Sequence, residues 1–260
     1  MIGQGSVQTT LTENDARQLI AQGFDSLAID GKRVLVIIPD GTRTAPIPLL
    51  FRLLNEQIGK RAAQIDFLIA LGTHQPMSDQ AIAHLVGVSM MERAAKYPKV
   101  RVFNHAWDRA DALQTIGVIS RDELDQLTGG LLAQDVPIRL NKLVNDYDHI
   151  VICGPVFPHE VVGFSGGAKY LFPGIAGAEI IDFTHWLAAL TTNRKTIGVK
   201  ETAVRRVIHR AAEFVQKPIT CISLVMQGQE FHGLYIGAYI EAWSAAADLS
   251  AQLNIIWVDK

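Results

Sequence analysis

The sequence predicts an α/β fold in which a mainly parallel, Rossmann-like sheet carries helices on both faces. The apolar runs Lys32–Asp40 and Ile65–Gly72 are short and uninterrupted, which is typical of strands buried on both faces. Residues 46–58, between them, repeat apolar side chains at helical spacing. Strands that alternate with helices favour a parallel sheet, because each helix carries the chain back to the edge where the next strand starts.

The first half of the chain contains three predicted strands and two predicted helices. Pro46 and Pro48 suit a first helical turn, where a missing N–H costs nothing. Ser78 is a suitable N-cap, because its hydroxyl can accept a hydrogen bond from an unpaired N–H of the first turn. The predicted order is a strand at 32–40, a helix at 46–58, a strand at 65–72, a helix at 77–87 and a strand at 99–105.

The second half contains an amphipathic helix at 200–215, for which we expect Arg205, Arg206 and Arg210 on the solvent side. Residues 219–227 and 230–237 are predicted as paired strands. The remaining predictions are a strand followed by a short helix at 117–127, strands at 136–144 and 147–158, helices at 177–193 and 238–253, and a final strand at 254–258.

Composition excludes several classes of protein. A net charge of −2 over 260 residues lacks the basic excess of a nucleic-acid-binding protein. Two cysteines, Cys153 and Cys221, are too few for a disulfide framework or a cysteine zinc cluster. Residues 1–11 do not resemble a signal peptide, and no apolar run reaches the roughly 18 residues that span a bilayer. We therefore expect a cytoplasmic protein with neither nucleic acid nor membrane as a partner.

Polar residues follow the predicted strands at their carboxyl ends. The segments Asp40–Arg43, Gly72–His74 and Asn104–His105 each come directly after a strand, and His159 follows the strand at 147–158. Ligands of open parallel sheets bind at this edge. The sequence therefore predicts a functional site where these segments meet.

The glycine-rich segment Pro158–Gly177 has three possible interpretations. Gly163–Gly167 matches the G-x-S-x-G nucleophile elbow with Ser165 as nucleophile, although prolines interrupt the strand and helix that this motif requires. The segment also approaches a phosphate loop without meeting its pattern. The third interpretation places backbone flat against a planar ligand, which Lys169 reaches; a lysine in a weakly charged setting has a lowered pKa and becomes nucleophilic.

Taken together, these segments resemble the lactate racemase family, whose members use a covalently tethered nickel pincer nucleotide. "DGTR" at 40–43 is similar to the family's Asp-x-x-Arg element, and "GTHQPMS" at 72–78 is similar to its Gly-x-His segment. "PHEVVGFSGGAKYLFPGIAG" at 158–177 closely resembles the family's histidine, Gly-Gly-x-Lys and Pro-Gly-Ile core. The position of His185 after this core also matches. The resemblance covers about residues 10–260 and is most specific over 154–185.

The resemblance implies how the cofactor is held. Lys169 resembles the lysine that bonds the pyridinium ring through a thioamide, and His185 resembles the protein ligand that completes the square-planar site of nickel. A neutral imidazole is a suitable donor for Ni(II). Gly166 and Gly167 are expected beside the planar ring, where a Cβ would obstruct its approach.

The resemblance also implies the catalytic groups. His74 and His159 are similar to two acid/base histidines that serve opposite faces of a 2-hydroxy acid, whose α-hydrogen passes as hydride to the cofactor. Arg43 is suited to hold a carboxylate or phosphate, and Asp40 is expected to orient a catalytic histidine.

The resemblance further implies a single α/β cofactor-binding domain at 1–260, with the second, C-terminal domain of the family absent from this chain. The implied partners are a 2-hydroxy acid substrate and the enzymes that make the cofactor. Two alternatives remain open at this point: a non-catalytic homologue that binds a nucleotide or the cofactor, and a serine hydrolase that uses Ser165.

Overall fold

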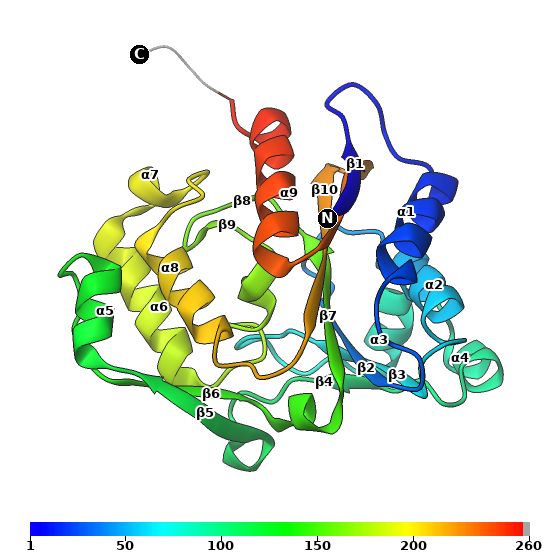
Figure 1. The fold of residues 1–260 in the computed structure, drawn as a ribbon, viewed down its shortest axis with the longest axis horizontal. Helices are drawn as coiled ribbons and strands as arrows, with labels where there is room; N and C mark the ends of the chain where they lie inside the picture. The colour runs from blue at the N-terminus through cyan, green and yellow to red at the C-terminus, as the bar shows by residue number, and fades with distance from the viewer. Residues whose placement is uncertain (257–260) are drawn as a thin grey trace.

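The computed structural model describes residues 1–256 and is built around a seven-stranded sheet in the order β1-β11-β10-β7-β2-β3-β4 (Figure 1). Every neighbouring pair from β10 to β4 is parallel, whereas β11 runs antiparallel to β10 and β1. The predicted mainly parallel α/β fold is confirmed. The strands are β1 Ile2–Gly5, β2 Arg33–Ile38, β3 Gln64–Ile69, β4 Val102–Asn104, β7 His149–Pro155, β10 Ile219–Gln227 and β11 Glu230–Gly237.

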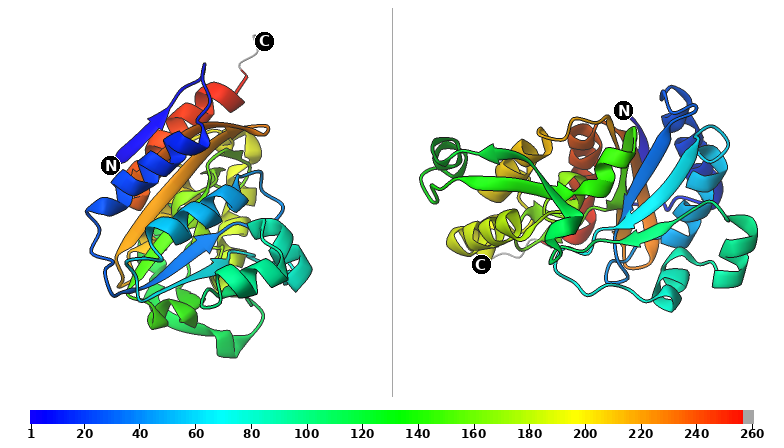
Figure 2. Two further views of the ribbon diagram at one scale, coloured as in Figure 1. Left: turned by 90° about the vertical axis from the view of Figure 1, so that its right-hand side faces the viewer. Right: turned by 90° about the horizontal axis from the view of Figure 1, so that it is seen from below.

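Helices cover both faces of the sheet, as Figure 2 shows from two further directions. One face carries α1 Glu13–Asp25, α2 Ile47–Gln57 and α3 Asp79–Val86, with α4 Met90–Lys96 beside α3. The other face carries α5 Arg121–Thr128, α6 Ala178–Thr191, α7 Asn193–Thr196, α8 Ala203–Ala212 and α9 Tyr239–Asn254. None of the helices within residues 1–256 is long and apolar enough to cross a membrane.

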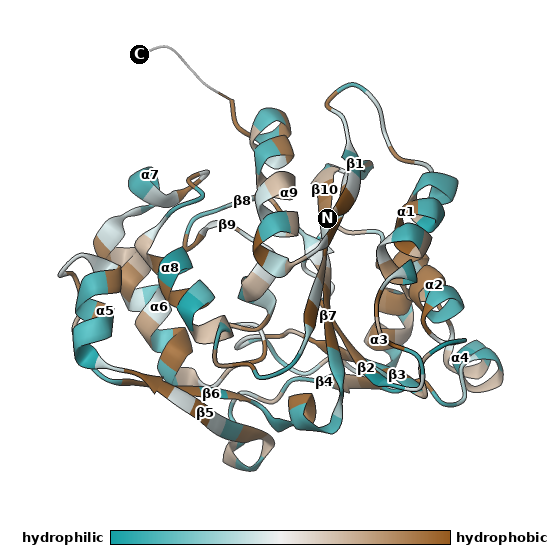
Figure 3. Cartoon of the chain, in the orientation of Figure 1, coloured by the Kyte–Doolittle hydropathy of each residue, from teal (hydrophilic) through white to brown (hydrophobic). Residues whose placement is uncertain are grey.

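Strand β2 shows why the apolar runs are uninterrupted. Val34 and Val36 pack into the core under α1, α2 and α3. Leu35 and Ile37 point the other way, into the core shared with α6 and α8. Successive side chains of a strand face opposite sides, so a strand between two helical layers needs apolar residues at every position. Figure 3 shows the resulting hydrophobic strands at the centre of the molecule.

Two small antiparallel pairs lie outside the main sheet. β5 Leu113–Ile119 pairs with β6 Val136–Asn141, and β8 Pro158–His159 pairs with β9 Gly163–Phe164. The predicted strands around 117 and 136 therefore exist, but they form a separate ribbon that packs on α6. The 3₁₀ turns are η1 Ala110–Ala112, η2 Lys142–Asp146 and η3 Gly167–Tyr170.

Two sequence predictions are wrong within the described residues. Arg205, expected on the solvent side of α8, is fully buried, whereas its neighbour Arg206 is exposed as expected. The expected final strand does not begin at Asn254, because that residue closes α9 and Ile255 and Ile256 follow without regular structure. The rest of that predicted strand lies outside the described residues. The short strand β1 and the helix α1 were not predicted.

Other local predictions are confirmed. The Ser78 hydroxyl accepts a hydrogen bond from the Ala81 N–H (3.2 Å) at the start of α3, and α2 begins at Ile47 with proline in its first turn. At the carboxyl edge of the sheet, the Gly72 N–H donates to the Gly174 carbonyl (2.9 Å). This bond joins the loop after β3 to the glycine-rich segment that follows β7, and it brings two predicted site segments together.

Candidate active site

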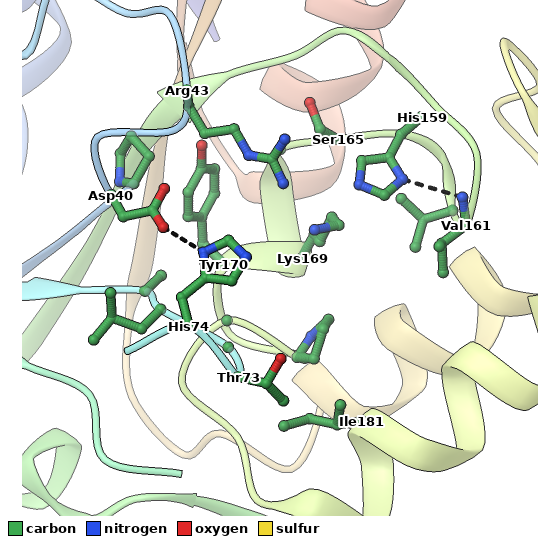
Figure 4. Close-up of a pocket in the computed structure, with 18 of the residues that line it drawn as sticks. Asp40, Arg43, Thr73, His74, His159, Val161, Ser165, Lys169, Tyr170 and Ile181 are labelled. Atoms are coloured by element: carbon green, nitrogen blue, oxygen red, sulfur yellow. Dashed lines mark hydrogen bonds and ion pairs between the residues drawn. The ribbon is translucent and has the colours of Figure 1, made fainter. Parts of the chain in front are cut away.

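All but one of the site residues that the family resemblance implies line a single cavity of about 290 Å³ at the carboxyl edge of β2, β3 and β7 (Figure 4). Apolar wall is supplied by Leu71, Phe157 and Ile181, among others. The exception among the predicted residues is Gly167. Those that line the cavity are Asp40, Arg43, His74, His159, Gly166, Lys169 and His185.

Asp40 and His74 form a pair on one side of the cavity. Asp40 Oδ2 lies 2.5 Å from His74 Nδ1, and Asp40 Oδ1 accepts from the backbone N–H of Thr42 (3.1 Å) and from its hydroxyl. Burial alone would raise the pKa of Asp40, but the bonds from Thr42 and His74 outweigh it and hold that pKa below its ordinary value. An ionised carboxylate only accepts, so His74 carries a proton on Nδ1, and the free nitrogen of its neutral form is Nε2.

His159 has the opposite tautomer on the other side of the cavity. The Val161 N–H donates to His159 Nδ1 (3.1 Å), and a backbone N–H can only donate, so the neutral ring carries its proton on Nε2. The Glu160 carboxylate lies 3.4 Å from the same Nδ1 and makes no hydrogen bond with it. Burial, together with the charges of Lys169 and Arg43, lowers the pKa of His159 to about 3. His159 is therefore neutral at pH 7.

Lys169 lies between the two histidines in the view of Figure 4, on the 3₁₀ turn η3. Within residues 1–256 its amine has no hydrogen-bond or ion-pair partner. Burial, followed by the positive charges of Arg43 and Arg205, lowers the pKa of Lys169 to about 8. About a tenth of this amine is thus uncharged at pH 7, far more than for an ordinary lysine, and the uncharged form is the one that attacks electrophiles.

His185 projects from α6 at the cavity with its ring partly exposed. Its Nδ1 donates to the Ile181 carbonyl (2.7 Å), so Nε2 is the nitrogen of the neutral ring that could bind a metal. Within the described residues there is no group of three or more His, Cys, Asp or Glu side chains that could hold a metal ion.

Arg43 follows β2 and stacks its guanidinium over the Phe157 ring, with the guanidinium carbon 5.5 Å from the ring centroid. Within residues 1–256 it pairs with no carboxylate. A planar fork of donors at a cavity wall is suited to an anionic group of a ligand.

The two glycines differ in their surroundings. Gly166 lines the cavity, and its φ of +78° is one that other residues rarely adopt. Gly167, with a φ of +58°, instead backs onto Trp243, because a Cβ at this position would lie 2.9 Å from the indole. Gly167 therefore permits close packing behind the cavity and does not line it.

Ser165 does not have the surroundings of a nucleophile. Its hydroxyl donates to the Pro155 carbonyl (3.0 Å) and accepts from the Phe157 N–H (3.0 Å). No histidine within residues 1–256 hydrogen-bonds to it. A serine nucleophile needs an adjacent base to take its proton, so the elbow interpretation lacks its essential partner.

Comparison with known proteins assigns the family. The profile of the lactate racemase N-terminal domain matches residues 8–198, which is well over half of the chain. This chain belongs to the lactate racemase N-terminal domain family. The family predicted from the glycine-rich segment and the strand-end motifs is confirmed.

Relatives of the lactate racemase N-terminal domain family differ from this chain in length. The lactate racemase of Thermoanaerobacterium thermosaccharolyticum is 27% identical over 221 residues, covering 82% of this chain and 47% of the relative. That of Lactiplantibacillus plantarum is 22% identical over 182 residues, covering 69% of this chain and 38% of the relative. The chain thus spans less than half the length of these two curated relatives.

Two solved structures share the fold of this chain. A protein from Thermotoga maritima superposes with a TM-score of 0.85 at 30% identity, over 99% of this chain and 62% of that one. The lactate racemase apoprotein from T. thermosaccharolyticum superposes with a TM-score of 0.73 at 21% identity, over 94% of this chain and 56% of that one.

Sequence reasoning missed some residues around this site and considered one that is not part of it. Arg205 and Trp243 lie under the segment that carries Lys169, and Tyr170 lines the cavity. His105, at a strand end, is buried with Nε2 on the Ala176 carbonyl (3.0 Å) and is not among the residues that line the cavity. Tyr170 follows Lys169 directly, so an aromatic side chain next to the predicted lysine was an available signal.

Proposed function

We propose that this chain is the single cofactor-binding domain of a 2-hydroxy acid racemase or epimerase of the lactate racemase type. One observation carries the proposal: a lysine with a pKa of about 8 shares a cavity with two histidines that have opposite tautomers. When the α-hydrogen moves as hydride, the hydroxyl of each enantiomer must lose and regain its proton, and two histidines on opposite sides of the cavity could serve the two enantiomers.

The residues fit a nickel pincer nucleotide. Lys169 offers an amine that has no partner within residues 1–256 for covalent attachment through a thioamide, and His185 offers the Nε2 of its neutral ring as a nickel ligand. The single histidine donor suits a metal whose other donors belong to the cofactor. When bound, this cofactor supplies an acceptor for the α-hydrogen of the substrate as hydride. Its attachment makes the enzymes that synthesise it necessary partners.

The side chains of this chain would handle the proton and the charge of the substrate. In the neutral form of His74, Nε2 can accept the hydroxyl proton, and Asp40 would stabilise the imidazolium that forms. Arg43 can bind the substrate carboxylate. That carboxylate would offset the positive charges around His159, whose pKa would then rise so that it could take and return protons on the other side.

Coexpression with cofactor-making enzymes tests this function. Intact-mass measurement should show an adduct on the wild-type chain and none on Lys169→Ala, while Lys195→Ala, at an exposed position on α7, should retain it. His185→Ala should keep the adduct but lose nickel on dialysis, because its ring nitrogen is the only protein ligand proposed. Absence of both adduct and nickel from the wild-type chain would rule the function out.

Incubating the loaded chain with one enantiomer of lactate separates two outcomes. Formation of the other enantiomer supports a racemase. An adduct without stereochemical exchange would instead identify a non-catalytic homologue that only carries the cofactor.

A further inference from the structure

Arg205 is a buried cation that nothing in the proposed reaction uses. Its side chain is fully buried on α8, and within residues 1–256 it forms no ion pair with a carboxylate. Its Nε also lacks a hydrogen-bond partner there. Burial lowers the pKa of Arg205 to about 9, opposed by the charge of Glu201. An uncompensated guanidinium is costly to bury, so its presence under the site needs an explanation.

The guanidinium binds the backbone that leads to Lys169. Arg205 donates from one terminal nitrogen to the Phe164 carbonyl and from the other to the Gly166 carbonyl (3.2 Å). The carbonyl between them, on Ser165, accepts from the Trp243 indole N–H (2.9 Å). Three consecutive carbonyls are therefore held by two side chains from α8 and α9.

The two side chains also hold each other. The guanidinium carbon of Arg205 lies 4.3 Å from the centroid of the Trp243 ring, a cation–π contact that keeps the charge beneath the segment. The absence of a Cβ at Gly167 lets the segment approach the indole closely. We call Arg205 and Trp243 the carbonyl clamp.

The clamp lies near enough to affect the charge of Lys169. The charged groups that act on this amine are Arg43 and Arg205, which favour its neutral form, and Glu160 and Asp40, which oppose them. Arg43 stands at the cavity wall, where an anionic ligand would neutralise it. Arg205 lies behind the segment, so its charge would persist after a ligand has bound.

We propose that Arg205 and Trp243 are positioning residues, which hold the segment Phe164–Gly167 so that Lys169 faces the cavity and loses its proton more readily than an ordinary lysine, as attachment of the cofactor requires. The purpose of the uncharged amine rests on the proposed function. The effect of the clamp on the amine does not, and it can be measured on the chain without any cofactor.

Competitive acetylation of the folded chain across a range of pH, read at Lys169 by peptide mass spectrometry, tests the proposal. Wild type should show a midpoint near pH 8, the pKa of Lys169. Arg205→Gln should raise that midpoint by about half a unit or more, which lowers the rate at pH 8 by roughly twofold or more. Arg206→Gln, a matched change on the exposed side of α8, should leave the midpoint in place. An unchanged midpoint in folded Arg205→Gln would overturn the proposal.

Two further variants separate charge from shape. Arg205→Lys keeps the positive charge but loses the two guanidinium nitrogens that donate to the carbonyls, so its midpoint should stay closer to that of wild type than the midpoint of Arg205→Gln does. Equal shifts in the two variants would show that the charge of Arg205 does not lower the pKa of Lys169. Trp243→Phe keeps an aromatic ring but removes the donor to Ser165, and it should shift the midpoint upward by a smaller amount. If Arg205→Gln does not fold, Trp243→Phe becomes the deciding variant. A midpoint of Lys169 acetylation in Trp243→Phe equal to that of wild type would then reject the clamp.

The result is independent of the proposed racemase function. A shifted midpoint in a chain that never acquires a nickel adduct would support the clamp and reject the function. An adduct on wild type with no shift in the variants would do the reverse.

Discussion

The two sides of the cavity position a histidine in contrasting ways. His74 belongs to a loop after β3, is half exposed at its side chain and faces the carboxylate of Asp40. His159 belongs to the glycine-rich segment, is buried, and is surrounded by the positive charges of Lys169, Arg43 and Arg205. One ring has its proton on Nδ1 and the other on Nε2.

This contrast shows that two histidines of one cavity can differ in what stabilises or opposes their protonated form. The carboxylate beside His74 stabilises the cation that forms when the ring takes a proton. The cations beside His159 oppose its protonation until an anion arrives. Under the proposed function, an anionic substrate would raise the pKa of His159, whereas His74 faces the Asp40 carboxylate before any substrate binds.

The largest expected effect concerns the two histidines themselves. His74→Asn and His159→Asn should each lower racemisation by the loaded chain by roughly 10²–10⁴-fold, the usual contribution of a general acid or base. The rates should be measured from both enantiomers of lactate with adduct content matched by intact mass. His84→Asn, on the exposed side of α3, is the control for loss of a histidine. Retention of most of the activity in His74→Asn or His159→Asn would show that the histidine replaced is not an acid/base group of the reaction.

The next effect concerns the pH dependence of stability, to which His159 contributes together with two other histidines of lowered pKa. Burial lowers the pKa of His105 to about 4, of His159 to about 3 and of His209 to about 4, so these rings stay neutral in the folded chain while they take up protons in the unfolded chain. Because the unfolded state then binds more protons, stability falls as pH decreases from about 6.5 towards 4, by about 2 kcal/mol for each ring at pH 5.

Urea unfolding at pH 7 and at pH 5 measures this loss. His159→Gln should reduce the difference between the two free energies of unfolding by about 2 kcal/mol, the share of one ring. The same difference in His159→Gln as in wild type would show that His159 is not buried as a neutral ring.

A smaller effect is expected on the exposed side. Asp40→Asn removes the negative charge beside His74, and an amide can also donate to Nδ1 and so favour the wrong tautomer. Activity should fall by about tenfold or more, as expected when a general base loses its orienting carboxylate. Nitrogen-15 NMR of the His74 ring should show the proton leaving Nδ1. An unaltered tautomer together with unaltered activity would mean that Asp40 does not orient His74.

The smallest effect distinguishes a structural serine from a nucleophile. Ser165→Ala removes one bond to the Pro155 carbonyl and one from the Phe157 N–H, at a cost of about 1–2 kcal/mol in the free energy of unfolding. Racemisation by the folded variant should remain within about twofold of wild type, since neither bond reaches the reacting atoms. Loss of an esterase activity in Ser165→Ala, with racemisation absent from wild type, would favour the hydrolase alternative.

Sequence alone determined those parts of this protein that depend on local pattern. The buried strands β2, β3 and β7 appear as uninterrupted apolar runs, because a strand between two helical layers has no polar face. The parallel order then placed Asp40, His74 and His159 at one edge, because the carboxyl ends of parallel strands meet there. Lys169 was predicted as a functional residue because a charged side chain is unusual in a segment of glycines and aromatic residues.

Only the tertiary structure decided the features that depend on contacts between distant segments. The amphipathic pattern predicts that Arg205, as a polar residue, faces solvent. Its hydrogen bonds to carbonyls 39 and 41 residues away in the sequence cannot be predicted from the local sequence. The tautomers of His74 and His159 depend on whether an acceptor or a donor meets Nδ1. The assignment of Gly167 to the back of the cavity depends on Trp243, which the chain reaches only at α9. Sequence periodicity indicates which face of one helix or strand is buried. The charge state and orientation of a side chain depend instead on the hydrogen-bond partners and charges that other helices and strands place beside it.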